Sequence, residues 1–266
     1  MIIDKSSYYP KSHLDDQDDE DSTAIIDAEA TVCTEAEDPV AAVPPVPQDA
    51  GLPEDPDDSS PGAKAVTAVS NLLSWALVPM LMPVYGIILV FGLSILAYTG
   101  FGVRLAFTAI TAAFNLVVPA IIVLILHRIG FIHDIGLNNR EERFVPYVVS
   151  ILCLLGTALF MWHKGAPRYL PLFFLGGAGA GLVEVIVNRW WKISVHAAGI
   201  AGIVALLLYL LIYEYTASET LTWLMIAVGA AGLLGASRIW LGRHTLWQVM
   251  AGYAVGFCSV FFIMKA

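Results

Sequence analysis

Apolar residues after Lys64 fall into seven runs, each long enough to cross a bilayer as a helix. A hydrocarbon core about 30 Å thick needs about 20 helical residues. The expected spans are Val66 to Leu96, Leu105 to Leu126, Phe144 to Trp162, Tyr169 to Val187, Ile193 to Tyr213, Leu221 to Trp240 and Thr245 to Met264. The sequence therefore predicts an all-α, polytopic transmembrane helical bundle of about six to seven spans. Pro79 and Pro83 predict a kink or a surface half-helix in the first run, because proline disrupts a helix interior.

Composition separates this region from the N-terminal part of the chain. Hydrophobic residues make up 58% of the 266 residues and charged residues 14%, whereas a soluble domain carries about 25% charged residues. Residues 1–64 contain 17 of the 23 acidic residues but 3 of the 14 Lys and Arg, so the acidic balance belongs to this part. A proline-rich acidic segment buries too little apolar surface to offset its chain entropy. We therefore expect a disordered acidic tail over residues 1–63, either a solvated spacer or a binding segment for a basic partner, and a transmembrane domain over residues 64–266.

The distribution of basic residues predicts the orientation in the membrane. Seven crossings place the tail on the same side as the connections after the second, fourth and sixth spans. That side holds eight basic residues near the spans and the opposite side four; the eight are Lys64, Arg128, Arg140, Arg143, Arg189, Lys192, Arg238 and Arg243. Cytoplasmic loops are enriched in Lys and Arg. We therefore expect a multi-pass protein of the cell (inner) membrane with a cytoplasmic N-terminus.

Two polar clusters lie where apolar runs begin or end, and polar residues at membrane depth are candidates for function. The first cluster is Lys192-Ile193-Ser194-Val195-His196, at the start of the fifth span. Lys192 and His196 are four residues apart and share a helix face. A helix N-terminus also presents free N–H groups to an anion.

The second cluster joins the sixth span to the seventh. Ser237-Arg238 closes the sixth span, Arg243-His244 opens the seventh, and Gln248 follows His244 by one turn on the same face. Gly252 and Gly256 continue that line and allow close helix packing. Two crossings separate the clusters, so both fall on the tail side of the membrane.

The residue types in the two clusters suit a phosphate ester. Arg offers a bidentate fork to phosphate oxygens and Lys a point charge. One histidine can act as a nucleophile while a second protonates the leaving oxygen.

The spacing of these residues resembles the type 2 phosphatidic acid phosphatase family. Ser237-Arg238, five residues, His244, three residues and Gln248 is similar to the last signature of that family, which reads Ser-Arg, five residues, His, three residues, Asp. Ser194-Val195-His196 resembles the middle signature, Pro-Ser-Gly-His, with Ile193 and Val195 in place of Pro and Gly. In the family two transmembrane helices separate these signatures, as they do here.

The resemblance implies a role for each candidate residue. His244 would be the nucleophile that forms a phosphohistidine, and His196 would be the general acid for the leaving group. Arg238, Ser194 and Lys192 would hold the phosphoryl oxygens and stabilise the transition state. The implied mechanism uses no metal and no cofactor.

Two features depart from the family pattern. Gln248 stands where the family has the Asp that orients the nucleophilic histidine, and a neutral amide stabilises imidazolium less than a carboxylate does. The first family signature, Lys, six residues, Arg-Pro, is not intact. Arg140 and Arg143, with Pro146, are its nearest substitute and are expected to bind phosphate. The expected third and fourth spans lie between them and Ser194.

The sequence is compatible with two functions. The leading one is a membrane-embedded phosphatase for a lipid phosphate or diphosphate, with membrane lipids and an anionic lipid phosphate as partners and no nucleic acid. The alternative is a catalytically inactive relative that binds or transports anionic lipid headgroups, which Gln248 favours. A prenyltransferase or alcohol phosphotransferase needs Asp-rich metal motifs, and Asp134 is the one Asp after residue 64. Glu184, in a Gly-rich apolar run, is expected to pair with a base such as Lys192 or Arg189. The sequence leaves the oligomeric state open.

Overall fold

The computed structural model describes residues 60–133, 141–214 and 218–266, and in these ranges the chain is helical with no strand. Seven helical segments there are long and apolar enough to cross a membrane, which confirms the predicted all-α polytopic fold. The α-helices are α1 (Pro61–Ala76), α2 (Met82–Leu93), α3 (Phe101–Ala112), α4 (Val118–Arg128), α5 (Phe144–His163), α6 (Tyr169–Val187), α7 (Val195–Tyr213), α8 (Thr220–Trp240) and α9 (Leu246–Lys265). Short 3₁₀ helices are η1 (Pro79–Leu81), η2 (Ile95–Tyr98) and η4 (Glu141–Arg143), and the π-helical segment η3 (Ala113–Val117) joins α3 to α4. The tail predicted to be disordered lies, up to residue 59, outside the described residues.

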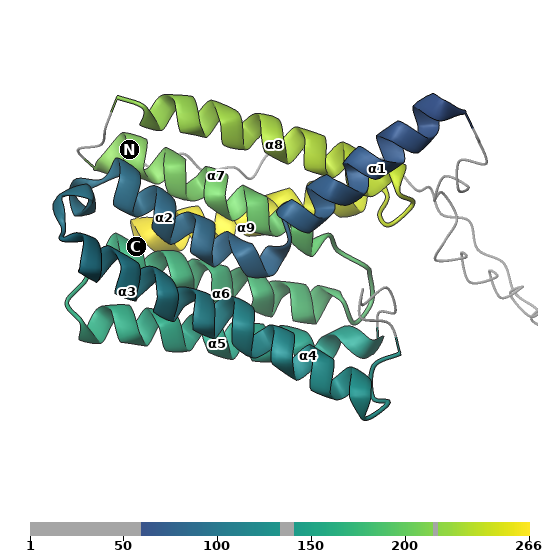
Figure 1. The fold of residues 1–266 in the computed structure, drawn as a ribbon, viewed down its shortest axis with the longest axis horizontal. Helices are drawn as coiled ribbons and strands as arrows, with labels where there is room; N and C mark the ends of the chain where they lie inside the picture. The colour runs from purple at the N-terminus through teal and green to yellow at the C-terminus, as the bar shows by residue number, and fades with distance from the viewer. Residues whose placement is uncertain (1–59, 134–140, 215–217) are drawn as a thin grey trace, which may run out of the picture. The chain divides into compact units, whose positions relative to one another are not determined.

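The first apolar run is broken into two helices. α1 begins after Ser60, whose hydroxyl accepts a hydrogen bond from the Ala63 N–H at 3.2 Å, and it ends before Pro79. Pro83 lies in the first turn of α2, where its missing N–H costs no intrahelical bond. The predicted kink is therefore confirmed, and α1 runs at an angle to α2 (Figure 1).

α7 forms the centre of the bundle. It packs most extensively against α9 and α8, and it also contacts α2 and α6. Buried apolar residues occur on all sides of α7, as expected for a helix surrounded by others. α5 packs along α6, and α6 in turn packs against α9, so α9 lies between α6 and α7.

Two glycines allow α9 to approach α7 closely. A Cβ atom at Gly252 would collide with the backbone carbonyl oxygen of Ser194, and one at Gly256 would collide with that of Ala198. Small residues at a helix interface bring backbones together in this way. The N-terminus of α9 is thereby held beside the N-terminus of α7.

The C-terminal ends of α4, α6 and α8 lie at one end of the bundle, on the right in Figure 1, where α1 also lies. Gly242 adopts a φ of 62° directly after α8, a left-handed conformation that closes a helix and favours glycine. The chain then enters α9 within a few residues, so Arg238 and His244 stay at the same end.

Candidate functional site

His244 precedes α9 and is held by a residue in the first turn of that helix. Its ring Nδ1 lies 3.2 Å from Oε1 of Gln248, and that same oxygen accepts a hydrogen bond from the Thr245 N–H at 3.2 Å. The Thr245 N–H can only donate, so its partner is the amide oxygen, and the His244 Nδ1 must be the protonated nitrogen. The Nε2 atom of neutral His244 therefore carries the free lone pair.

The N-terminus of α9 fixes Gln248 independently of His244. The Thr245 hydroxyl accepts a hydrogen bond from the Gln248 N–H at 3.4 Å, and the two residues form a reciprocal capping box. His244 is 3% exposed and Gln248 is 6% exposed, so neither side chain is free to rotate into solvent. The capping box thus fixes the position of the Gln248 amide at the N-terminus of α9.

Burial and nearby cations keep His244 neutral. Burial, followed by the charges of Arg238, Lys192 and Arg143, lowers the pKa of His244 to about 2, although its hydrogen bond to Gln248 acts in the opposite direction. A histidine with this pKa is uncharged at neutral pH. Three cations gathered around an uncharged ring leave a site with an excess of positive charge, which favours an anion.

The start of α7 is bonded to the start of α9. The backbone N–H of Ser194 donates to the backbone carbonyl oxygen of Gln248 at 3.2 Å, and the buried Ser194 hydroxyl caps α7 by accepting from the Ala197 N–H at 3.4 Å. His196 lies in the first turn of α7. The structure thus brings both sequence clusters together at one end of the bundle.

Arg143 joins this group from α5, although two helices separate it from Ser194 in the chain. The residue is 6% exposed at the N-terminus of α5, and its charge acts on His244, His196 and Arg238. The separation noted in the sequence is overcome because α5 packs along α6, whose end leads into α7. Arg140 lies outside the described residues.

Glu184 of α6 is buried close to Arg143. It is 4% exposed, and within the described part of the chain its Oε1 atom has no hydrogen-bond partner. Arg143 is the basic residue whose charge acts on it, in place of the Lys192 or Arg189 named from the sequence. The Arg143 side chain also hydrogen-bonds Tyr147, one turn further along α5.

Ser74 of α1 is a member of the site that the sequence analysis missed. Its hydroxyl accepts a hydrogen bond from Arg238 Nη1 at 3.4 Å, and its backbone carbonyl accepts one from the His196 ring. No motif marks this serine. The available signal was its place on the stripe of small and polar residues formed by Ala63, Thr67, Ser70 and Ser74, at helical spacing.

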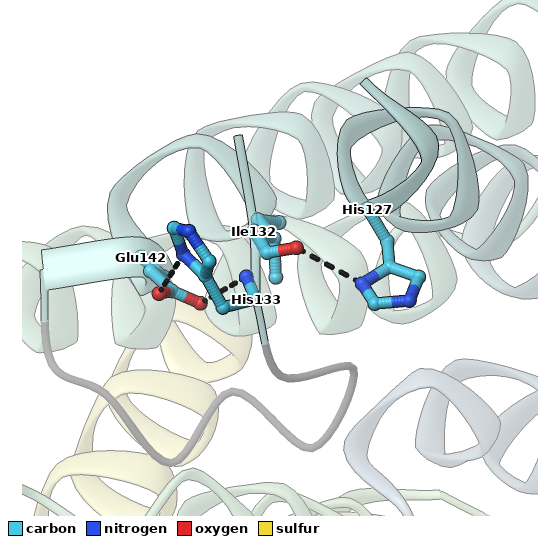
Figure 2. Close-up of polar contacts among 4 residues, drawn as sticks. All are labelled: His127, Ile132, His133 and Glu142. Atoms are coloured by element: carbon cyan, nitrogen blue, oxygen red, sulfur yellow. Dashed lines mark hydrogen bonds and ion pairs between the residues drawn. The ribbon is translucent and has the colours of Figure 1, made fainter. Parts of the chain in front are cut away.

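Three polar contacts hold the chain ahead of Arg143 (Figure 2). Glu142 accepts hydrogen bonds from the His133 N–H and from His133 Nδ1, both at 3.1 Å. His127, in the last turn of α4, lies with its Nδ1 2.9 Å from the carbonyl oxygen of Ile132. These contacts link the end of α4 to the residue before Arg143, and so support its position.

Comparison with known proteins gives one family match. Residues 149–266 match the family model described as the PAP2 superfamily. No curated protein and no solved structure gives a significant match. The matched region contains Ser194, His196, Arg238 and His244, whereas Ser74 and Arg143 precede it. This match over residues 149–266 supports the assignment of the chain to the PAP2 superfamily.

Proposed function

We propose that this protein is a membrane-embedded phosphatase that hydrolyses a lipid phosphate or diphosphate through a phosphohistidine intermediate. The observation that carries the proposal is the protonation pattern of His244. Gln248 accepts from Nδ1, so the lone pair of Nε2 is available to attack phosphorus, and the surrounding cations favour a phosphate group.

In the first step Nε2 of His244 forms a bond to phosphorus, and the bond from phosphorus to the leaving oxygen breaks. The electron pair of that bond stays with the leaving oxygen, which receives a proton from His196, a step that requires His196 to be in its protonated, imidazolium form when the phosphate is bound. Arg238, Arg143 and Lys192 hold the other phosphoryl oxygens, whose charge grows in the transition state. Ser194 adds a hydroxyl at the same helix terminus.

In the second step water attacks the phosphohistidine. His196, now neutral, takes a proton from the water, the bond between phosphorus and Nε2 breaks, and inorganic phosphate leaves. His244 returns to its neutral form with Nδ1 still donating to Gln248. Each step is balanced by the two histidines and water alone.

Gln248 sets the expected speed of the first step. When Nε2 bonds to phosphorus the imidazole becomes cationic, and an amide oxygen stabilises that charge less than a carboxylate does. The capping box nevertheless holds the amide oxygen on Nδ1 and so preserves the productive tautomer. We therefore expect a slow enzyme rather than an inert one.

The place of the site favours a lipid substrate. The residues lie at one end of a bundle of membrane-spanning helices, where a phosphate headgroup meets the ends of the helices while the lipid chains remain in the bilayer. The excess of Lys and Arg near this end supports a cytoplasmic placement of the site, at the inner leaflet of the cell membrane.

Phosphate release from a panel of lipid monophosphates and diphosphates, by purified full-length protein in detergent with EDTA present, tests the proposal. The wild-type protein should release phosphate, and His244→Ala should abolish release. His163→Ala, at an exposed histidine at the end of α5, is the matched control and should behave as the wild type. If no lipid phosphate is hydrolysed while anionic headgroups still bind, the protein is a binding or transport relative and the proposal is wrong.

A further inference from the structure

α1 turns a polar face toward α8 and an apolar face outward. Trp240 Nε1 of α8 donates to the Thr67 hydroxyl at 3.1 Å, and Arg238 donates to Ser74 two turns further along α1. Ser70, between them, is buried. The outward face is apolar and exposed; it consists of Val66, Val69, Leu72 and Trp75. A helix with this pattern is held to the bundle by polar contacts while its apolar face meets lipid.

Ser74 is the point at which α1 reaches the site. It contacts two functional candidates from two different helices, Arg238 of α8 through its hydroxyl and His196 of α7 through its backbone carbonyl. Within the described residues, the Nε atom of Arg238 is buried without a hydrogen-bond partner. The Ser74 hydroxyl is therefore a contact that directs this guanidinium.

We propose that Ser74 is a positioning residue, which holds Arg238 and His196 in the arrangement that receives the phosphate group and its leaving oxygen. The inference rests on the proposed phosphatase function. It assigns to α1, which precedes the region shared with the PAP2 superfamily, a part in the reaction.

The two contacts act on different stages of the reaction. A guanidinium that is already oriented loses less side-chain entropy when it binds phosphate, so the hydroxyl contact acts on binding. A carbonyl that accepts from one ring nitrogen of His196 orients the ring and leaves the other nitrogen toward the leaving oxygen, so this contact acts on proton transfer. The two contacts can therefore be separated experimentally.

The hydroxyl contact is tested by Ser74→Ala, with inhibition by orthovanadate and the Michaelis constant as readouts. Loss of one hydrogen bond to a charged group should raise the vanadate inhibition constant about three- to tenfold. The turnover number should change less than about twofold, because the carbonyl of residue 74 is retained. Ser74→Thr, which keeps a hydroxyl, should restore wild-type inhibition. Ser70→Ala, on the same buried face one turn earlier, is the matched control and should leave inhibition unchanged.

The carbonyl contact is tested by Ser74→Leu, whose larger side chain displaces α1 from Arg238 and His196. Hydrolysis of an alkyl phosphate should then slow at least about tenfold more than hydrolysis of an aryl phosphate, whose leaving group needs less proton assistance. A general loss of folding would slow both substrates equally. Equal slowing therefore counts against the proposal.

A double-mutant cycle tests whether Ser74 acts through Arg238. Ser74→Ala and Arg238→Lys should be non-additive in vanadate inhibition, whereas Ser70→Ala and Arg238→Lys should be additive. If vanadate inhibits Ser74→Ala as tightly as it inhibits the wild type, or more tightly, the positioning role is wrong even though the enzyme is active. If the wild-type protein neither binds vanadate nor hydrolyses any phosphate ester, the proposed function fails and the role of Ser74 fails with it.

Discussion

The backbone N–H of Ser194 donates to the backbone carbonyl oxygen of Gln248 across 3.2 Å. The side chain of the same Gln248 holds His244, also at 3.2 Å. One residue of α9 therefore fixes both the start of α7, which carries His196, and the ring of His244. This relationship makes the contact between α7 and α9 the element on which the geometry of the site depends.

Gly252→Ala should disrupt that contact. A Cβ at position 252 meets the carbonyl of Ser194, which belongs to the backbone and cannot rotate away. We expect a loss of about 1–3 kcal/mol in the free energy of unfolding and at least about tenfold lower phosphatase activity. Gly229→Ala is the control, because a Cβ there meets no atom within 4 Å. Thermal unfolding in detergent should show Gly229→Ala unchanged or slightly stabilised; equal stability of the two variants would contradict the argument.

Gln248→Asp should raise turnover. A carboxylate next to Nδ1 stabilises the imidazolium that forms when Nε2 bonds to phosphorus, and it offsets part of the surrounding positive charge. We expect an increase of about tenfold or more, whereas Gln248→Leu, which has no acceptor for Nδ1, should lower turnover by a similar factor. Single-turnover kinetics with a lipid phosphate measures both. An aspartate variant no faster than wild type, together with a leucine variant no slower, would show that residue 248 does not act on His244.

The buried His244 should make folding stability depend on pH. In the folded protein its pKa is lowered to about 2, mainly by burial, whereas in the unfolded chain it is about 6.5. Below about pH 6.5 the unfolded state therefore binds the proton more readily, and the stability contributed by His244 falls as the pH falls toward about 2. Above that range both states are neutral and the contribution is constant.

Thermal unfolding between about pH 7.5 and about pH 5 measures this effect. The melting temperature of the wild type should fall over this range. The melting temperature of His244→Gln should fall less, because this variant lacks the imidazole that must stay uncharged in the folded protein. His163→Ala should keep the wild-type dependence. If His244→Gln follows the wild-type curve, burial of a neutral His244 does not contribute to the pH dependence.

Arg143 and Glu184 should behave as a coupled buried pair. Arg143→Met removes a cation that acts on His244 and should weaken vanadate inhibition about tenfold or more. It also leaves Glu184 buried without this basic neighbour, so the variant should lose about 1–3 kcal/mol of stability. Adding Glu184→Gln should recover part of that stability but none of the inhibition. A double variant less stable than Arg143→Met alone would exclude the coupling.

The sequence predicted the helices, and it predicted that the two histidine-containing clusters lie at the same end of the bundle, because both inferences depend on local patterns. Apolar runs marked the seven spans, the prolines marked the break between α1 and α2, and the number of crossings between His196 and His244 predicted that they share one end of the bundle. These inferences require only the spacing of residues along one segment or the number of segments between two residues. Neither kind of information depends on which helices are neighbours.

Contacts between helices that are far apart in the chain could not be predicted from the sequence. No motif contains Ser74, and its contact with Arg238 arises only because α1 packs on α8. Arg143 was named as a phosphate-binding candidate, although its distance from Ser194 along the chain gave no reason for them to meet; the packing of α5 along α6 supplies that reason. The partner of Glu184 was misjudged because proximity in sequence pointed to Arg189 and Lys192, whereas the packing of α5 along α6 selects Arg143.

Trapping the covalent intermediate shows whether His244 is the nucleophile. The purified full-length protein is mixed with a radiolabelled lipid phosphate in the presence of EDTA, quenched in base, in which phosphohistidine survives, and digested for peptide mapping. We expect an acid-labile phosphoryl group on the peptide that carries His244 in the wild type and in His163→Ala, and none in His244→Ala. Phosphate release by His244→Ala at the wild-type rate, or label on a different residue, would contradict it.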